Sequence, residues 1–181
     1  MTKIISQKFY QQPTLVVAKK LLGKYLVRKI GRQKIIGQIV ETEAYCGPHD
    51  LASHASRGLT ERNKVMFGPA GHWYVYLIYG MYYCLNVVTE RNNYPAAVLI
   101  RSVRPISGPT NKMKVDGPGK LCRAFKIDKS LNQKSACQQK TKLWIEDHQI
   151  KVGAIKKAKR VGVAYAGQYQ NKLWRFYLIA N

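Results

Sequence analysis

Two glutamates in an apolar segment are the residues of this sequence best suited, by type and spacing, to chemistry. Residues 39–45 read Ile-Val-Glu-Thr-Glu-Ala-Tyr. Because side chains alternate along a β-strand, Glu41, Glu43 and Tyr45 share one face, and the small side chains between them suit a core. A carboxylate beside an aromatic ring fits a general base; the structural alternative is an exposed edge strand whose two carboxylates pair with Lys or Arg. The alternation does not decide which glutamate would be the catalyst.

An aromatic run follows at residues 73–83, Trp-Tyr-Val-Tyr-Leu-Ile-Tyr-Gly-Met-Tyr-Tyr. Its β propensity predicts a hairpin whose two-residue turn is Gly80-Met81. Tyr79 stands directly before the turn, where a ring can project and wedge into a base stack. Tyr76 can form the wall of a base-sized pocket, because aromatic rings stack on any base. The alternative for both is a plain core strand with tyrosine hydroxyls at its rim.

The charge balance points to a polyanionic partner. Lys and Arg number 31 against 9 Asp and Glu, which gives a net charge of +22 and a pI near 10.0. Nucleic acid is the first candidate and an anionic membrane the second. No apolar run approaches membrane-spanning length, no basic amphipathic helix stands out, and the first residues lack a signal-peptide pattern, so we expect no membrane partner.

The cysteines and histidines give no metal-site spacing. The four cysteines form no C-x-x-C pair, and the four histidines form no H-x-x-x-H pair. The zinc deaminase signature of base-flipping enzymes is missing as well. We therefore expect reduced thiols, no metal and no cofactor.

The positioning elements predict a mixed α/β (α+β) fold. With 181 residues, of which 46% are hydrophobic, the chain can form a single domain, residues 1–181, with a real core. We expect a curved, largely antiparallel sheet with peripheral helices. The expected strands are residues 24–30, 34–45, 72–79, 82–89, 96–104, 143–145, 161–165 and 173–179. The expected helices are residues 14–22, capped by Thr14, and residues 116–125; the basic run 156–160 is expected to be a solvated face.

Residues 116–120, Asp-Gly-Pro-Gly-Lys, open the second expected helix. Backbone amides at a helix start favour an anion, and Lys120 adds charge, so the segment fits a phosphate contact. The alternative is helix-start punctuation, with Asp116 as the cap and Pro118 in the first turn.

Taken together, these residues resemble a known family, the alkyladenine (3-methyladenine) DNA glycosylases, which remove alkylated and deaminated purines. The match runs in order along almost the whole chain, which makes it specific. Its pieces are Val40-Glu-Thr-Glu-Ala-Tyr45, Gly47-Pro48, His54, Arg62-Asn63, Met66-Phe67, Tyr74-Val-Tyr76, Ile78-Tyr-Gly-Met-Tyr82, Asn86, Val98-Leu99, Arg101, Gly117-Pro118, Lys120-Leu-Cys122, Arg160-Val-Gly-Val163, Ala166-Gly167 and Arg175-Phe-Tyr177.

The resemblance implies roles for the candidate residues. Glu43 would be the general base that activates water, with Arg101 close to that water and to the carboxylate. Tyr45, His54 and Tyr76 would enclose the flipped base by stacking and edge contacts.

The resemblance also implies contacts with the duplex and a basis for selection. Tyr79 would fill the gap that the flipped nucleotide leaves. Asn86 would shape the pocket floor and discourage guanine through its exocyclic amine. We further expect Arg62 and Lys120 to contact the DNA backbone. His54 alone would more often be structural, so its role rests on the resemblance.

The expected function is base-excision DNA repair by a monofunctional DNA glycosylase. It would flip an alkylated or deaminated purine out of duplex DNA, hydrolyse the N-glycosidic bond with a Glu-activated water and leave an abasic site. The lesion class is 3-methyladenine, 7-methylguanine, hypoxanthine and ethenoadenine. A non-catalytic basic nucleic-acid-binding protein is the alternative; it would leave the acidic strand unexplained.

The expected partner is double-stranded DNA containing damaged purines, bound by a monomer. We expect it in the cytoplasm or nucleoid of a bacterium, or in the nucleus of a eukaryote. The chain departs from the family pattern at His49, at Cys46, and in the short segment 58–61, where Glu61 replaces a frequent proline. These positions adjoin the expected pocket, so they leave the chemistry in place and bear on substrate breadth.

Overall fold

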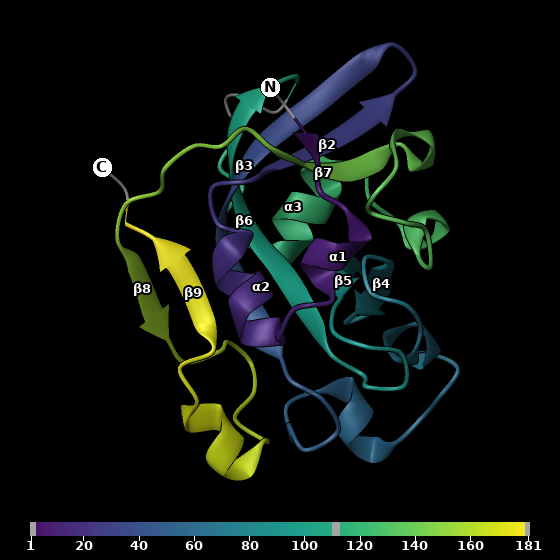
Figure 1. Cartoon of the computed structure of the whole chain (residues 1–181), viewed down its shortest axis with the longest axis vertical. Coiled ribbons are helices and arrows are strands. Elements are labelled where there is room, and N and C mark those ends of the chain that lie inside the picture. The colour runs from purple at the N-terminus through teal and green to yellow at the C-terminus, as the bar shows by residue number, and fades with distance from the viewer. Residues whose placement is uncertain (1–2, 110–112, 180–181) are drawn as a thin grey trace.

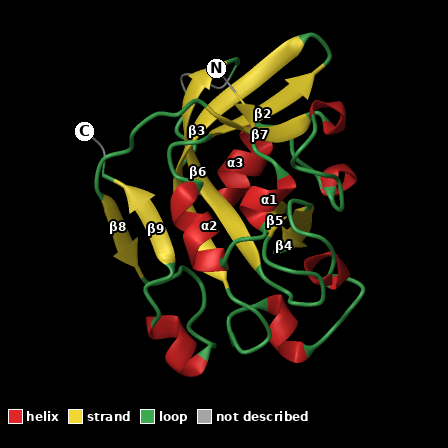
Figure 2. Cartoon of the chain, in the orientation of Figure 1, coloured by secondary structure: helices red, strands yellow, loops and turns green. Residues whose placement is uncertain are grey.

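A curled antiparallel sheet forms the frame of the molecule (Figures 1 and 2). The computed structural model describes residues 3–109 and 113–179. The strand order is β1-β7-β2-β3-β6-β5-β4, with β9 pairing to β3 and β8 to β9. The strands are β1 (Lys3–Ile4), β2 (Tyr25–Ile30), β3 (Gln33–Tyr45), β4 (Trp73–Ile78), β5 (Tyr82–Val88), β6 (Ala97–Ser107), β7 (Leu143–Asp147), β8 (Ile155–Ala158) and β9 (Arg175–Leu178). The predicted class, mixed α/β around a curved antiparallel sheet, is confirmed.

In the described part of the chain the α-helices are short: α1 (Gln7–Tyr10), α2 (Thr14–Lys20) and α3 (Pro118–Ala124). Helix α2 lies against β3 and β6, and α3 lies against β5 and β6. Single 3₁₀ turns lie at His54–Arg57, Lys64–Phe67, Lys129–Leu131, Gln139–Thr141 and Gly167–Asn171. Within the described ranges, no helix has the length and apolar character that crossing a bilayer requires.

The longest strand, β3, shifts its register around Glu41. Ile39 pairs with Val103 of β6, but Glu41 pairs with Ser102, so the ladder skips one residue of β3 between them. Such an irregularity changes which positions face the core. Ile39 is buried before the shift, and Thr42 is buried after it, where its hydroxyl donates to Ala18 O at 2.9 Å. The shift turns the predicted acidic face away from α2.

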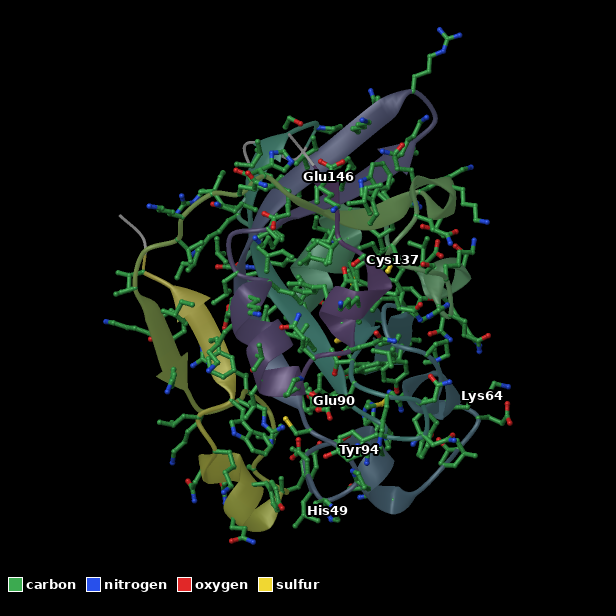
Figure 3. All side chains as sticks on the ribbon, viewed as in Figure 1. His49, Lys64, Glu90, Tyr94, Cys137 and Glu146 are labelled. Atoms are coloured by element: carbon green, nitrogen blue, oxygen red, sulfur yellow. The ribbon has the colours of Figure 1, made fainter. Side chains whose placement is uncertain are left out.

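The start of α2 corrects one prediction. Thr14 is the first helical residue and not the cap; Pro13 stands at the cap position and makes no side-chain cap bond. Instead, Glu90 accepts the Thr14 N–H at 3.0 Å, and Figure 3 shows Glu90 beside the start of this helix. A carboxylate from a distant turn therefore satisfies an amide that the local sequence leaves open.

Two further predictions about strands are wrong. Residues 161–165 form bends and turns and no strand, and a short strand lies instead at Ile155–Ala158, which overlaps the start of the run 156–160 expected to be a solvated face. The hairpin turn has three residues, because Ile78 pairs directly with Tyr82. Tyr79 therefore lies inside the turn and adopts a positive φ of 54°.

Candidate active site

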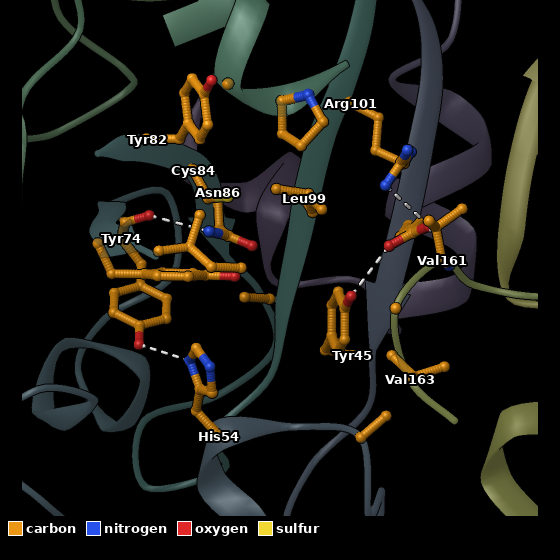
Figure 4. A pocket seen from close by; sticks show the side chains of 18 of the residues that line it. Tyr45, His54, Tyr74, Tyr82, Cys84, Asn86, Leu99, Arg101, Val161 and Val163 are labelled. Atoms are coloured by element: carbon orange, nitrogen blue, oxygen red, sulfur yellow. Dashed lines mark hydrogen bonds and ion pairs between the residues drawn. The ribbon is translucent and has the colours of Figure 1, made fainter. Parts of the chain in front are cut away.

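A cavity of about 520 Å³ opens between the middle of the sheet, the aromatic hairpin and the start of α3. This size is in the range of small-molecule sites. Figure 4 shows its walls: β3 and residues 161–163 on one side, and β4 and β5 with the 3₁₀ turn of His54 on the other. The sequence-predicted residues that line it are Glu43, Tyr45, His54, Tyr76, Tyr79, Asn86, Arg101 and Lys120.

The geometry separates the two glutamates. Glu41 does not line the cavity; its Oε1 accepts from Arg101 Nε at 3.1 Å and from Arg175 Nη1 at 2.9 Å. Ion pairing, the structural alternative, therefore describes Glu41. Glu43 is fully buried at the cavity wall. The strand is not an exposed edge here, because β6 and β9 flank it on both sides.

The Glu43 carboxylate is held by two hydrogen bonds and one ion pair. Tyr45 Oη donates to Oε2 at 2.9 Å, and the Val161 N–H donates to Oε1 at 2.9 Å. Arg101 Nη1 lies 3.4 Å from the same Oε1. Burial raises the pKa of Glu43, while Arg101, the Val161 amide and the Tyr45 hydroxyl oppose that rise. The result is an oriented, desolvated carboxylate, which suits a general base.

His54 enters the cavity from the opposite wall. Its Nδ1 lies 2.8 Å from the Tyr74 hydroxyl. Its ring meets the Tyr76 ring edge-on, with 4.6 Å between the two ring centres. Burial first, and the nearby Arg62 charge second, lower its pKa to about 4. The imidazole is therefore neutral near pH 7, with one nitrogen as donor and the other as acceptor. Such a ring can make an edge contact to a base without adding positive charge.

Tyr76 and Asn86 complete this wall. The guanidinium of Arg62 lies 5.0 Å from the centre of the Tyr76 ring, and burial raises the pKa of that tyrosine. Asn86 is buried, and its amide nitrogen donates to Tyr74 O at 3.1 Å. Figure 4 shows the amide oxygen of Asn86 pointing away from this bond. The Asn86 side chain is thus fixed in one orientation where it lines the cavity.

Comparison with known proteins identifies the family of this chain. A family model described as Methylpurine-DNA glycosylase (MPG) matches residues 8–181. This chain belongs to the methylpurine-DNA glycosylase family. The resemblance and the enzyme class predicted from the sequence, a DNA glycosylase acting on N-glycosyl bonds in DNA repair, are thereby confirmed.

Curated relatives agree along nearly the full length. A protein of Legionella pneumophila (strain Paris) is 49% identical over 100% of this chain and 97% of its own. One from Methanocella arvoryzae is 48% identical over 96% and 92%, and one from Myxococcus xanthus is 45% identical over 96% and 89%. Each of these methylpurine-DNA glycosylase relatives is named "Putative 3-methyladenine DNA glycosylase".

The hairpin tip of this methylpurine-DNA glycosylase is exposed and apolar. Tyr79 is 81% exposed and Met81 is 66% exposed. The tip is closed by a bond of 3.2 Å from Met81 N–H to Ile78 O, with Gly80 also at positive φ. A left-handed conformation is uncommon for a tyrosine. Tyr79 also lines the cavity, and its role as a wedge in DNA stays a prediction.

The two expected backbone contacts differ in setting. Arg62 is exposed but does not line the cavity; its Nη2 donates to Leu77 O at 2.9 Å. Lys120 lines the cavity and pairs with Asp116 at 2.7 Å. Asp116 does not cap α3, which starts after Gly117 without a side-chain cap bond. Contact of either cation with DNA stays a prediction.

Several residues of the methylpurine-DNA glycosylase site were not assigned from the sequence. Val161 supplies its backbone amide, which no side-chain pattern reveals. Tyr82 and Tyr165 also line the cavity, and neither of them has a role predicted from the sequence. The departures from the family pattern, Cys46, His49 and residues 58–61, do not line it.

Proposed function

We propose that this methylpurine-DNA glycosylase flips a damaged purine nucleotide out of duplex DNA and hydrolyses its N-glycosidic bond with water activated by Glu43. The observation that carries the proposal is the buried Glu43 carboxylate, held by two hydrogen bonds and one ion pair at the wall of a base-sized cavity. A carboxylate in this position can deprotonate water and also stabilise positive charge that develops on the sugar.

The cavity supports recognition of a flat, electron-poor base. Tyr45 and Tyr76 offer aromatic faces, and the neutral His54 offers a hydrogen-bonding edge. Aromatic faces stack on any base and attract a cationic one more strongly. An alkylated purine such as 3-methyladenine or 7-methylguanine carries such a charge.

The absence of a second acid fits the same substrate class. Among the described residues that line the cavity, Glu43 is the only carboxylate. Ordinary glycosidases use a second carboxyl group to protonate the leaving group. A cationic alkylated purine leaves without that proton, which makes it the base that this site releases with least help. Hypoxanthine and ethenoadenine complete the proposed lesion class.

The reaction is proposed to be monofunctional and to end at an abasic site. A lyase step needs a neutral lysine that forms a Schiff base. The lysine that lines the cavity, Lys120, forms an ion pair with Asp116 at 2.7 Å, and no lysine contacts Glu43 among the described residues. Hydrolysis by water is therefore the step that the residues around Glu43 support.

The test compares Glu43→Gln with the matched variant Glu41→Gln. Each protein is incubated, in the presence of a chelator, with hypoxanthine-containing or methylated duplex, and the released base is measured under single-turnover conditions. We expect Glu43→Gln to bind the duplex and to lose about 10²- to 10⁴-fold in rate. Glu41→Gln makes the same chemical change outside the cavity, and we expect it to keep most of the activity. Near-normal release by Glu43→Gln overturns the proposal.

A further inference from the structure

A buried ion pair lies next to Tyr45 and Val161, the two residues that donate hydrogen bonds to the proposed general base, Glu43. Arg160 and Asp50 both have fully buried side chains, and the Arg160 guanidinium binds both carboxylate oxygens, Nη2 to Oδ1 at 2.7 Å and Nη1 to Oδ2. Asp50 opposes the effect of burial and raises the pKa of Arg160, so the guanidinium stays charged. A two-bond arginine–carboxylate pair fixes orientation as well as distance.

Aromatic rings cover the same guanidinium. Arg160 Cζ lies 4.9 Å from the centre of the Tyr45 ring and 5.0 Å from the centre of the Trp174 ring. Arg160 also donates to Ala44 O at 2.9 Å. Tyr45 is thus held through its ring face by Arg160, while its hydroxyl reaches Glu43.

Val161, the residue after Arg160, donates the second hydrogen bond to the proposed general base, Glu43. The Val161 N–H donates to Glu43 Oε1 at 2.9 Å. Residues 161–165 belong to no strand, so no ladder of backbone bonds fixes this amide. Its neighbour Arg160 is the anchored point of the segment. Both hydrogen-bond donors to Glu43 therefore depend on one arginine that does not line the cavity.

We propose that Arg160, through its pair with Asp50, is a positioning residue for hydrolysis: it holds the Tyr45 ring and the Val161 amide in register with Glu43. This inference rests on the proposed role of Glu43 as the general base. It assigns a function to a basic residue that the local sequence places on a solvated face.

The pH profile distinguishes positioning from a merely structural role. The Val161 amide and the Tyr45 hydroxyl both lower the pKa of Glu43, so their displacement raises it further. Glu43 then stays protonated to higher pH, and the acid limb of the rate profile moves upward. The other charged or titratable groups that face Glu43 are Arg101 of β6, Glu41 of β3 and Cys84 of β5; none of them contacts Arg160 through a bond found in the structure.

The experiment uses the full chain with Arg160→Met and Asp50→Asn combined, which avoids leaving one buried charge unpaired. The control is Lys24→Met with Asp147→Asn, the corresponding changes at a partly exposed ion pair of 2.7 Å outside the cavity. Single-turnover release of hypoxanthine is measured across pH. Affinity is measured with a duplex that carries a stable abasic-site analogue, and active-site titration corrects for unfolded protein.

We expect the Arg160/Asp50 double variant to lose about ten- to a hundredfold in rate at neutral pH, as a small misplacement of catalytic groups does. Its acid limb should move to higher pH, with affinity within about twofold of the unmodified enzyme. The Lys24/Asp147 control should change neither. A normal rate and profile, or a rate loss with an unmoved acid limb, overturns the inference.

Two further variants keep the outcome decisive. If the double variant does not fold, Trp174→Leu removes one face of the stack and leaves both charges in place; an unmoved acid limb there overturns the inference. Glu43→Gln is run beside them. If Glu43→Gln is active, the proposed function fails; if it is inactive while the Arg160 variants behave normally, only the positioning role fails.

Discussion

The hydroxyl of Tyr45 donates a hydrogen bond of 2.9 Å to Oε2 of Glu43, two positions earlier on the same strand. One strand therefore carries both a carboxylate and a donor that orients it. Removing the donor by Tyr45→Phe keeps the ring for stacking. Hydrogen bonds to charged groups contribute about 1.5–3 kcal/mol, so we expect about a tenfold or larger loss in single-turnover rate. The hydrogen bond from Tyr45 lowers the pKa of Glu43, so its removal raises that pKa and should move the acid limb of the rate profile to higher pH. An unchanged pH profile contradicts this.

The ionised Glu43 carboxylate that the proposed catalysis requires should lower the stability of the folded protein. Burial raises the pKa of Glu43, so the folded protein binds this proton more tightly than the unfolded chain does, and the ionised group opposes folding above its pKa. We expect Glu43→Gln to raise the free energy of unfolding by about 0.5–2 kcal/mol at pH 7.5, measured by urea denaturation. Glu41→Gln, which weakens two ion pairs, should not stabilise. A Glu43→Gln protein less stable than the unmodified enzyme counts against this account.

The hairpin tip predicts a defect specific to duplex DNA. Tyr79 is 81% exposed, so Tyr79→Ala should leave the melting temperature unchanged. Without the ring, the gap left by the flipped nucleotide is unfilled, and excision from duplex should fall by tenfold or more, about the cost of one stacking contact. Excision from a single strand, where nothing must be unstacked, should change less. Leu59→Ala, also exposed but outside the cavity lining, is the matched control. Equal losses on both substrates would speak against a wedge.

His54 predicts a pH dependence of stability. Its pKa is lowered from 6.5 to about 4, so the unfolded chain binds this proton more readily than the folded protein. The contribution of the neutral His54 ring to the free energy of unfolding is fully present above pH 6.5 and is lost as the pH falls toward 4. We expect His54→Asn to flatten the fall in stability across this window, followed by thermal melting at several pH values. His72→Asn, at a histidine outside the cavity, should retain the slope.

Lys120 predicts a salt effect. If it contacts a phosphate, Lys120→Ala reduces the slope of log binding constant against log salt by about one and leaves the excision rate of bound substrate unchanged. Lys20→Ala, an exposed cation on α2, serves as the comparison. Titrations at several salt concentrations measure both slopes. Identical slopes for all three proteins would remove Lys120 from the DNA contact.

The strand carrying Glu41 and Glu43 was predictable because alternation is a local property of the chain. Which glutamate faces the cavity was not, since both lie on one side of β3. Arg175 and Val161 make the difference, and they reach Glu41 and Glu43 across 134 and 118 residues. Local pattern carries no information about such partners; only resemblance to a family chose between the two.

The errors have the same origin. Arg160 was placed on a solvated face because its neighbours are basic, but its partner Asp50 lies 110 residues away. Gly80 marked the hairpin correctly, yet the turn is one residue longer than predicted because Tyr79 itself takes the left-handed conformation. Side-chain environment overrode composition in the first case, and local backbone strain overrode turn statistics in the second.

The long separation between Glu43 and its partners also sets an order of assembly during synthesis. The hairpin and the central strands precede residues 160–175 on the ribosome, so the surface with Tyr79 at its tip is made first. At that stage Glu43 has Arg101 and Tyr45 beside it but no Val161 amide, and Asp50 has no counter-ion. The residues proposed to recognise the lesion thus lie early in the chain, and the Val161 amide joins the proposed general base, Glu43, only after the C-terminal segment has been made.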